Sequence, residues 1–395
     1  MRVRAGDLAE VSAVVLRGDA RSLPLPDESV DLIVTSPPYF GLRDYRDGDA
    51  SLAGQIGSEA TPREYIAALI DCTREWMRVL KPCGSMFVNL GDKYGGTKSL
   101  LGLPWRYALA CIDQLGLILR AEIIWAKPNG LPESATDRVR RSHEQVFHFT
   151  RQPRYYSAVD EIREAHAPGN QARSTPNGMR RGIRDARATE ISGGVDNYDG
   201  PNPLGKLPGS VWDIPSQPLI VPAHLGLDHF AAFPMELPRR CILGWSPPGV
   251  CTACGQGRRP VAERERTFYR FSSTGLYGAE GRADLDSVTR TGRDGRNGGR
   301  AATTATITGY ACACPQPDAP TRPAVVVDPF GGTGTTALVA SVNGRHGITV
   351  DRSADYCRLA EWRTRDPGER AKAMRVPKPP PVPVGQGDLF DLEAS

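Results

Sequence analysis

The sequence lacks any uninterrupted apolar run of the roughly 18 residues that a membrane-spanning helix requires. Its first residues also lack the continuous apolar core of a secretory signal peptide, so we expect a cytoplasmic protein that does not contact a membrane. Neither sign of charge is in large excess: 49 basic residues face 45 acidic ones, for a net charge of +4. Such a mildly basic chain permits nucleic-acid binding without requiring it.

Nine cysteines in a reducing compartment are not expected to form a disulfide framework. Four of them form two short pairs, Cys251-x-x-Cys254 and Cys312-x-Cys314, on either side of a segment rich in Gly and Arg. Tetrahedral zinc takes four thiolates, and each short pair delivers two ligands from one turn. The gap between the pairs is longer than in an ordinary zinc ribbon, so inert thiols remain an alternative. We expect a structural zinc ion at the base of an insertion.

The stretch around which the chain is organised is Asp31–Tyr39. Leu32, Ile33 and Val34 are typical of a buried parallel strand, which ends at Thr35 and the turn Ser36-Pro37-Pro38-Tyr39. Two consecutive prolines have no backbone donor and a fixed φ, so the turn is rigid. It presents a hydroxyl, carbonyls and an aromatic ring at the carboxyl end of a strand, where open α/β sheets bind ligands.

A second buried strand, 325–328, leads into a glycine loop and a helix that starts at Thr335 and ends near Gly344. Glycines allow the backbone to approach a ligand closely at a helix N-terminus. Gly332-x-Gly334-x-x-Ala337 also fits a dinucleotide fingerprint, so the loop alone is compatible with NAD. The next strand ends at Asp351, a candidate for the ribose hydroxyls of either cofactor. A dehydrogenase has no use for the turn at 36–39.

Together, Ser36-Pro37-Pro38-Tyr39 and the later loop Asp328-Pro329-Phe330-Gly331-Gly332-Thr333-Gly334-Thr335-Thr336 resemble the DNA amino-methyltransferases, in the motif order called the β class. The resemblance implies an α/β fold: a Rossmann-like S-adenosylmethionine methyltransferase sheet, circularly permuted, with inserted target-recognition and zinc-binding segments. It implies methyl transfer from S-adenosylmethionine to the exocyclic amino group of a flipped base in double-stranded DNA. Ser at the first motif position favours cytosine N4, with adenine N6 as the alternative. An RNA methyltransferase and a catalytically inactive DNA-binding module are weaker alternatives.

The resemblance also assigns roles. Ser36 and the Pro37 carbonyl would accept hydrogen bonds from the target amine, Pro38 completes the turn, and Tyr39 would stack on the base. The expected cofactor contacts are Asp19, Thr35, Phe233, Pro234, Asp328, Pro329, Phe330, Gly331, Gly332, Gly334, Thr335, Thr336 and Asp351. For Asp19, expected near the adenine, a plain turn aspartate is an equal alternative. Helix start and packing explain Phe233 and Pro234 almost as well.

The same resemblance expects the base pocket to be lined by the region from Lys127-Pro128-Asn129 through Arg138, Arg140 and Arg141 to His143-Glu144. For His143-Glu144 we favour a strand-start hydrogen bond. The flanking segments 122–127 and 145–149 predict an antiparallel pair at the sheet edge.

Local signals predict two helices. Thr61-Pro62-Arg63-Glu64 forms a capping box before an apolar pattern that runs to Leu80, after which Lys81-Pro82 should end the helix. Ser85–Leu90 should then be a strand, with Cys83 a turn residue rather than the Pro-Cys nucleophile of cytosine-C5 methyltransferases. The second helix should span 103–115 and end at Gly116.

These features divide the chain into a catalytic half (1–164), a flexible basic target-recognition segment (165–210), a cofactor-contacting segment (211–250), a cysteine-clasped insertion (251–322), a cofactor-binding half (323–366) and a Pro-rich tail (367–395). The arginines at 173, 180, 181, 184 and 187 suit phosphate contact, with a bland linker as the alternative. In the tail, Gln386-Gly387-Asp388-Leu389-Phe390 resembles the bacterial sliding-clamp-binding pentapeptide except at Gly387. The alternative is that Leu389 and Phe390 fold back onto the enzyme. A cognate restriction nuclease is a candidate partner, and the sequence does not show whether one accompanies the protein.

Overall fold

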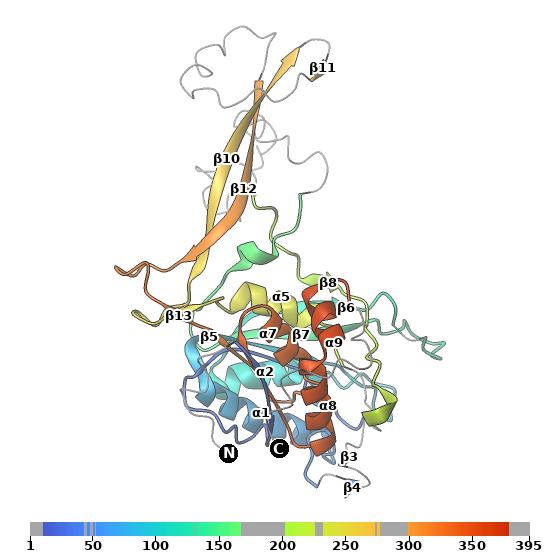
Figure 1. Cartoon of the computed structure of the whole chain (residues 1–395). Coiled ribbons are helices and arrows are strands. Elements are labelled where there is room, and N and C mark those ends of the chain that lie inside the picture. Colours follow the sequence, from blue (N-terminus) through green and yellow to red (C-terminus); the bar gives the residue numbers. More distant parts are fainter. Residues whose placement is uncertain are drawn as a thin grey trace. The chain divides into compact units, whose positions relative to one another are not determined.

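The computed structural model describes residues 11–42, 46–47, 50–51, 53–130, 132–166, 202–225, 232–272, 275–276 and 299–378. The chain divides into two compact units (Figure 1). The first is built from 1–157, 210–257 and 318–395, and the second from 158–209 and 258–317.

The first unit is organised around an eight-stranded sheet (Figure 1). In spatial order its strands are β1 (Ala13–Arg17), β15 (His346–Asp351), β14 (Val325–Asp328), β2 (Val30–Thr35), β5 (Leu80–Leu90), β7 (His143–Thr150), β6 (Ile118–Ala126) and β8 (Val211–Asp213). The first five are parallel to one another, and β7 is antiparallel to both β5 and β6. The carboxyl ends of the five parallel strands therefore share one edge of the sheet with the amino end of β7. This is the Rossmann-like α/β sheet that the sequence predicted.

The central strands are buried on both faces because helices cover both. α1 (Pro62–Val79) and α2 (Leu103–Leu115) pack against a core that includes Ile33, Met86 and Val327. The side chains at the alternate positions of these strands point to the opposite face of the sheet. On that face, Phe87 of β5 stacks on His148 and contacts Trp245 of α5 (Glu236–Trp245). The described residues of the first unit also form α7 (Thr335–Val342), α8 (Ala354–Arg365), α9 (Pro367–Met374) and the 3-10 segment η3 (Ala223–Leu225), and those of the second unit form the 3-10 segment η2 (Val159–Ile162). Among the described residues, no helix is long and apolar enough to cross a membrane.

Both predicted helices are present, and the predicted start of α1 and end of α2 are confirmed. The Thr61 hydroxyl accepts a bond from the Glu64 backbone N–H at 3.2 Å, and the Glu64 carboxylate accepts one from the Thr61 N–H at 3.0 Å. This is the capping box that the sequence indicated. α2 ends at Gly116, whose φ of 65° lies in the left-handed region that glycine adopts without strain.

The prediction for the start of β5 was wrong. The helix ends at Val79, and Leu80 already pairs with Val30, so Lys81-Pro82 lies inside the strand. The pairing then moves from Val30↔Leu80 to Leu32↔Ser85, which leaves 81–84 as a bulge. Lys81 forms an ion pair at 2.5 Å with Asp31, which is 7% exposed, and this fixes the bulge. Cys83 is exposed in the bulge, not in a turn after a helix.

Two further expectations need correction. The pair β6–β7 is not at the edge of the sheet, because the short strand β8 pairs with β6. The expected tail does not begin directly after Asp366. Residues 367–374 form α9, which packs on α7 and α8. The Asp366 side chain caps this helix through the Glu369 N–H at 2.8 Å, and Pro367 follows at the first helical position. The sequence carried this start signal in the same form as at Thr61.

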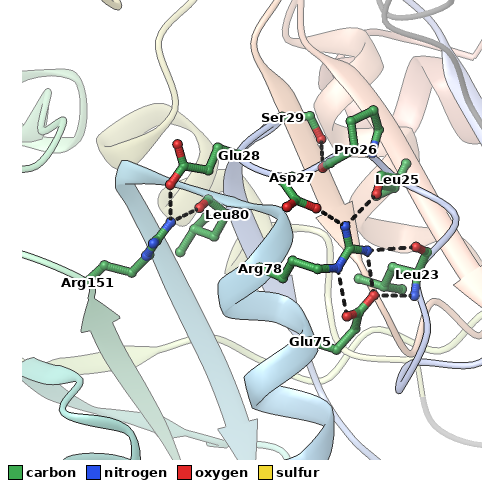
Figure 2. A network of polar contacts seen from close by, with 10 residues as sticks. All are labelled: Leu23, Leu25, Pro26, Asp27, Glu28, Ser29, Glu75, Arg78, Leu80 and Arg151. Atoms are coloured by element: carbon green, nitrogen blue, oxygen red, sulfur yellow. Dashed lines mark hydrogen bonds and ion pairs between the residues drawn. The ribbon is translucent and has the colours of Figure 1, made fainter.

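The loop between β1 and β2 is held by Arg78 at the end of α1 (Figure 2). Its guanidinium donates to the carbonyls of Leu23 and Leu25, each at 3.0 Å, and pairs with Asp27 and Glu75. The Glu75 carboxylate in turn accepts the Leu23 N–H at 2.7 Å. This network fixes the connection that leads into β2.

The second unit contains a long antiparallel hairpin that the sequence reasoning did not predict. β10 (Arg259–Ser272) pairs with β12 (Gly299–Ala311), and β11 (Gly275–Leu276) pairs with the end of β10. Short strand pairs in the first unit are β9 (Val250–Cys251) with β13 (Thr321–Arg322), and β3 (Arg46–Asp47) with β4 (Ala50–Ser51).

Candidate active site

A cavity of about 480 Å³ opens at the carboxyl edge of the first unit's sheet, and both sequence motifs line it. The four residues of the turn 36–39 all reach it. Of the expected cofactor contacts, eight line the cavity: Asp19, Phe233, Pro329, Phe330, Gly331, Gly332, Thr335 and Asp351. Five do not: Thr35, Pro234, Asp328, Gly334 and Thr336. The cavity thus joins two motifs that lie almost 300 residues apart in the sequence.

The glycine loop follows β14 and is tied to β15. The Gly331 N–H donates to the Val350 carbonyl, and the Gly332 N–H donates to Asp351 Oδ2, both at 2.9 Å. A Cβ at Gly331 would stand 1.4 Å from Thr349 Oγ1, so the loop can lie this close to β15 only with glycine there. Gly332 has a φ of +48°, and a Cβ there would meet no protein atom. That open space beside the backbone is suited to a ligand.

Asp328 supports the loop from behind and does not line the cavity. Its carboxylate accepts the Phe330 N–H at 3.1 Å and the Thr336 hydroxyl at 2.9 Å. The side chain is 1% exposed, and this burial raises the pKa of Asp328 to about 6. Asp328 therefore orients Phe330 and the first turn of α7.

Two carboxylates reach the cavity from the ends of β1 and β15. Burial raises the pKa of Asp351, whose oxygens accept the Gly332 and Ser353 N–H groups at 2.9 Å. Asp19 is held by Arg21, which contacts it with its backbone N–H, Nε and Nη2. Burial by itself raises the pKa of Asp19, but the Arg21 contacts outweigh it and leave this pKa below its usual value.

The turn 36–39 is anchored on two sides. The Tyr65 hydroxyl of α1 donates to the Pro38 carbonyl at 2.9 Å. The Tyr39 ring lies against Gly91 at the end of β5, where an added Cβ would be 2.5 Å from the ring. Tyr39 is therefore held in one position, with its hydroxyl directed to the neighbouring strands.

A polar network surrounds the Tyr39 hydroxyl. Tyr39 donates to Glu144 Oε2 at 2.6 Å, and the Asn89 amide donates to Ser36 Oγ, the Tyr39 hydroxyl and Glu144 Oε2 at 3.3, 2.9 and 2.7 Å. Lys127 pairs with the other Glu144 oxygen and lies over the Trp125 ring, 4.2 Å from its centroid. Burial, with the nearby Glu144 charge, raises the pKa of Tyr39 well above its usual value.

The sequence reasoning did not select Asn89 as a site residue, and for Glu144 it favoured a strand-start hydrogen bond. The bonds of Glu144 instead join side chains from four segments inside the cavity wall. Two signals pointed there: Asn89 is a polar residue near the end of an apolar strand, and Glu144 is the second residue of the strand that pairs antiparallel with β5. Lys127 also lines the cavity, whereas Asn129, Arg138, Arg140 and Arg141 do not.

Of the four predicted metal ligands, Cys251 is the last residue of β9 and Cys254 follows that strand, while Cys312 and Cys314 follow β12. Their Sγ atoms are all within 4.8 Å of one another, with Cys251 buried, Cys254 exposed, and Cys312 and Cys314 half-buried. The arginine-rich segment 173–187 and the pentapeptide Gln386–Phe390 lie outside the described residues.

Comparison with known proteins decides the family. The family model described as DNA methylase, of the N6 and N4 type, matches residues 30–252 and 321–362, which is more than half of the chain. The chain belongs to this DNA methylase family. The methylase is an S-adenosylmethionine-dependent DNA amino-methyltransferase, as the two motifs predicted, and its substrate is double-stranded DNA.

Individual relatives agree with this assignment. The methylase is 33% identical to the Type II methyltransferase M.SmaI of Serratia marcescens over 268 residues, which are 60% of this chain and 77% of the relative. It is 39% identical to the Type II methyltransferase M.SfiI of Streptomyces fimbriatus over 158 residues, 36% of each chain. Among solved structures, the PvuII DNA methyltransferase, cytosine-N4-specific, matches over 93% of both chains with a TM-score of 0.52 and 17% identity. That likeness shows the shared fold.

Proposed function

We propose that this methylase modifies the exocyclic N4 amine of cytosine at a specific DNA sequence, with Ser36 and the Pro37 carbonyl as the groups that receive the amine. The observation that carries the proposal is that the turn 36–39 and the loop 329–332 line one cavity. Ser36 as the first motif residue favours cytosine over adenine. A fold shared with a cytosine-N4-specific enzyme is consistent with this choice.

The cavity suits both reactants. S-adenosylmethionine supplies an electrophilic methyl group, and its ribose and methionine would be held by Asp351, the backbone of Gly331 and Gly332, and Phe330. The volume of about 480 Å³ lies within the usual range of small-molecule sites, roughly 300–1,000 Å³. We further propose Asp19 and Phe233 as contacts near the two ends of the cofactor. Thr35, Pro234, Asp328, Gly334 and Thr336 would act by holding the loop and the turn.

The target amine requires activation because its lone pair is delocalised into the base. Hydrogen bonds from the amine to Ser36 Oγ and the Pro37 carbonyl would place its nitrogen in line with the methyl group and favour positive charge on nitrogen. The amine of a paired base lies inside the duplex, so the base must be flipped into the cavity. Tyr39 would bound the base pocket with its ring.

The test separates binding from chemistry. We expect Ser36→Ala to lower the single-turnover rate of methyl transfer to duplex DNA by at least about 100-fold, a typical contribution of such a group. S-adenosylmethionine binding, measured by calorimetry, should stay unchanged. Gly332→Asp should abolish cofactor binding, because its side chain would enter the space beside the loop. Ser58→Ala, outside the cavity, is the matched control. Full activity of Ser36→Ala would refute the proposed role.

We also propose that the four cysteines bind one structural zinc ion. Zn–S bonds of about 2.3 Å in a tetrahedral site place sulfurs about 3.8 Å apart, which sulfurs within 4.8 Å of one another can reach by small shifts. Metal analysis should find about one zinc per chain, lost in the double variant Cys251→Ser/Cys254→Ser and retained in Cys83→Ser. A zinc-free preparation with unchanged thermal stability would exclude the site.

The order of the strands supports a circular permutation, which remains our inference. β2, with the catalytic turn, precedes β14, with the cofactor loop, by almost 300 residues in the chain, yet the two strands are neighbours in the sheet. Four further expectations also stay predictions. They are the domain boundaries within the insertion, target recognition by the basic segment 173–187, a partner nuclease, and sliding-clamp binding by Gln386–Phe390. A peptide covering 382–395, titrated against the host's clamp, tests the last of these.

A further inference from the structure

The side chains of the turn 36–39 do not end at the cavity surface. They belong to a hydrogen-bond network that continues into the protein. In it, Ser36 Oγ lies 3.3 Å from the Tyr39 hydroxyl, which lies 2.6 Å from Glu144 Oε2. Glu144 provides the only carboxylate in this hydrogen-bond network, and Lys127 forms an ion pair with it from the other side. The proposed role of Ser36 uses only its Oγ atom, the first member of this network, and gives no function to Tyr39 and Glu144 as hydrogen-bond partners.

Donor and acceptor capacity fixes the direction of the hydrogen bonds. An ionised carboxylate can only accept, so the Tyr39 hydroxyl must donate its single proton to Glu144. The Asn89 amide nitrogen can only donate, and it faces the oxygens of Ser36, Tyr39 and Glu144. Tyr39 can therefore bond to Ser36 only as an acceptor, and Ser36 must be the donor. Every hydroxyl proton points from the cavity toward Glu144.

We propose that Glu144 is the final proton acceptor of the methyl transfer, reached from the target amine through Ser36 and Tyr39. The inference rests on the proposed function of the turn but holds for cytosine N4 and adenine N6 alike. Glu144 acts through Tyr39, so it is a positioning residue for the phenol as well as the end of the relay. Asn89 keeps the three oxygens in register, and Lys127 holds the carboxylate from its other side through an ion pair.

The step is balanced in atoms and charge. A bond forms between the amine nitrogen and the methyl carbon while the bond from that carbon to the sulfonium sulfur breaks, leaving its electron pair on sulfur. The nitrogen gives one proton to Ser36 Oγ, the Ser36 proton moves to the Tyr39 oxygen, and the Tyr39 proton moves to Glu144. The sulfonium charge and the carboxylate charge disappear together, and Glu144 ends as a neutral acid. Exchange with water after product release restores it.

The relay is tested by two variants that keep the shape of the site. Tyr39→Phe retains the ring but removes the hydroxyl, and Glu144→Gln retains the size but replaces the carboxylate that takes up the proton with an amide. We expect each to lower the single-turnover rate by about 100-fold or more, within the range of general base catalysis. Affinities for S-adenosylmethionine and duplex DNA should change by less than about threefold. Because both residues serve one path, the double variant should be no slower than the slower single variant.

Matched measurements keep the outcomes distinct. Glu122→Gln, on β6 outside the cavity, should behave as wild type, and thermal unfolding of every variant verifies the fold. If Glu144→Gln or Tyr39→Phe methylates DNA at the wild-type rate, the relay is refuted. If either change weakens only DNA or cofactor binding and the rate at saturation is unchanged, the role is structural and the relay is again refuted. If wild-type protein itself methylates no DNA, the proposed function fails rather than the relay.

Discussion

Asp328→Asn should change how the stability of the methylase depends on pH. The Asp328 carboxyl is 1% exposed, and its pKa is raised from 3.8 to about 6 by burial. The native state therefore binds its proton more tightly than the unfolded state does, and stability falls as pH rises through this interval. Because each unit of pKa corresponds to about 1.36 kcal/mol, this rise in the pKa of Asp328 amounts to about 3 kcal/mol. This cost is absent below about pH 4 and fully present above about pH 6.

Asparagine does not titrate, so the variant should lack this dependence. The free energy of unfolding of Asp328→Asn minus that of wild type should rise by about 3 kcal/mol between pH 4 and pH 7. Urea unfolding, followed by tryptophan fluorescence at several pH values without cofactor, measures this difference in free energy. The contributions of other titrating groups largely cancel, because both proteins share them. Asp71→Asn is the control, because the Asp71 side chain is 63% exposed and stays in water in both states. Parallel pH curves for wild type and Asp328→Asn would refute the reasoning.

The remaining predictions concern the loop and the last helix. Gly331→Ala should destabilise the protein by about 2 kcal/mol or more and abolish cofactor binding, since its Cβ would overlap Thr349, whereas Gly332→Ala should cost only about 1 kcal/mol of backbone strain. Chemical denaturation and calorimetric titration measure both, and equal effects would contradict the difference in packing. Glu369→Ala should lower stability by about 3 kcal/mol, because it leaves the buried Arg363 guanidinium without its ion pair; a loss below about 0.5 kcal/mol in chemical denaturation would show that the pair is dispensable.

The sequence predicted the fold and much of the site because their signals are local. The alternation of strand and glycine loop at 325–336, the capping box at Thr61 and the Pro-Pro turn each depend on a few consecutive residues, and the structure confirms these elements. The shared sheet edge then places both motifs on one cavity. Even α9 could have been predicted from its Asp366-Pro367 start.

What the sequence did not reveal depends on contacts between distant segments. The bonds of Glu144 require β7 to run antiparallel beside β5, so that its first residues meet the carboxyl ends of the parallel strands. The bulge at 81–84 exists because Lys81 pairs with Asp31 across two strands, which no local pattern indicates. The hairpin pairs β10 with β12 although 26 residues, 273–298, separate the two strands in the sequence, and no short turn motif between them indicates the pairing.

The most direct test of the central claim is the chemical identity of the product. Plasmid DNA from a host that expresses the methylase, digested to nucleosides and analysed by mass spectrometry with authentic standards, should contain N4-methylcytosine. Methylation-aware sequencing of the same DNA should place it at one recognition sequence, and DNA from a host with the Ser36→Ala variant should lack it. N6-methyladenine alone would contradict the assigned base, and C5-methylcytosine or unmodified DNA would contradict amine methylation by the turn 36–39.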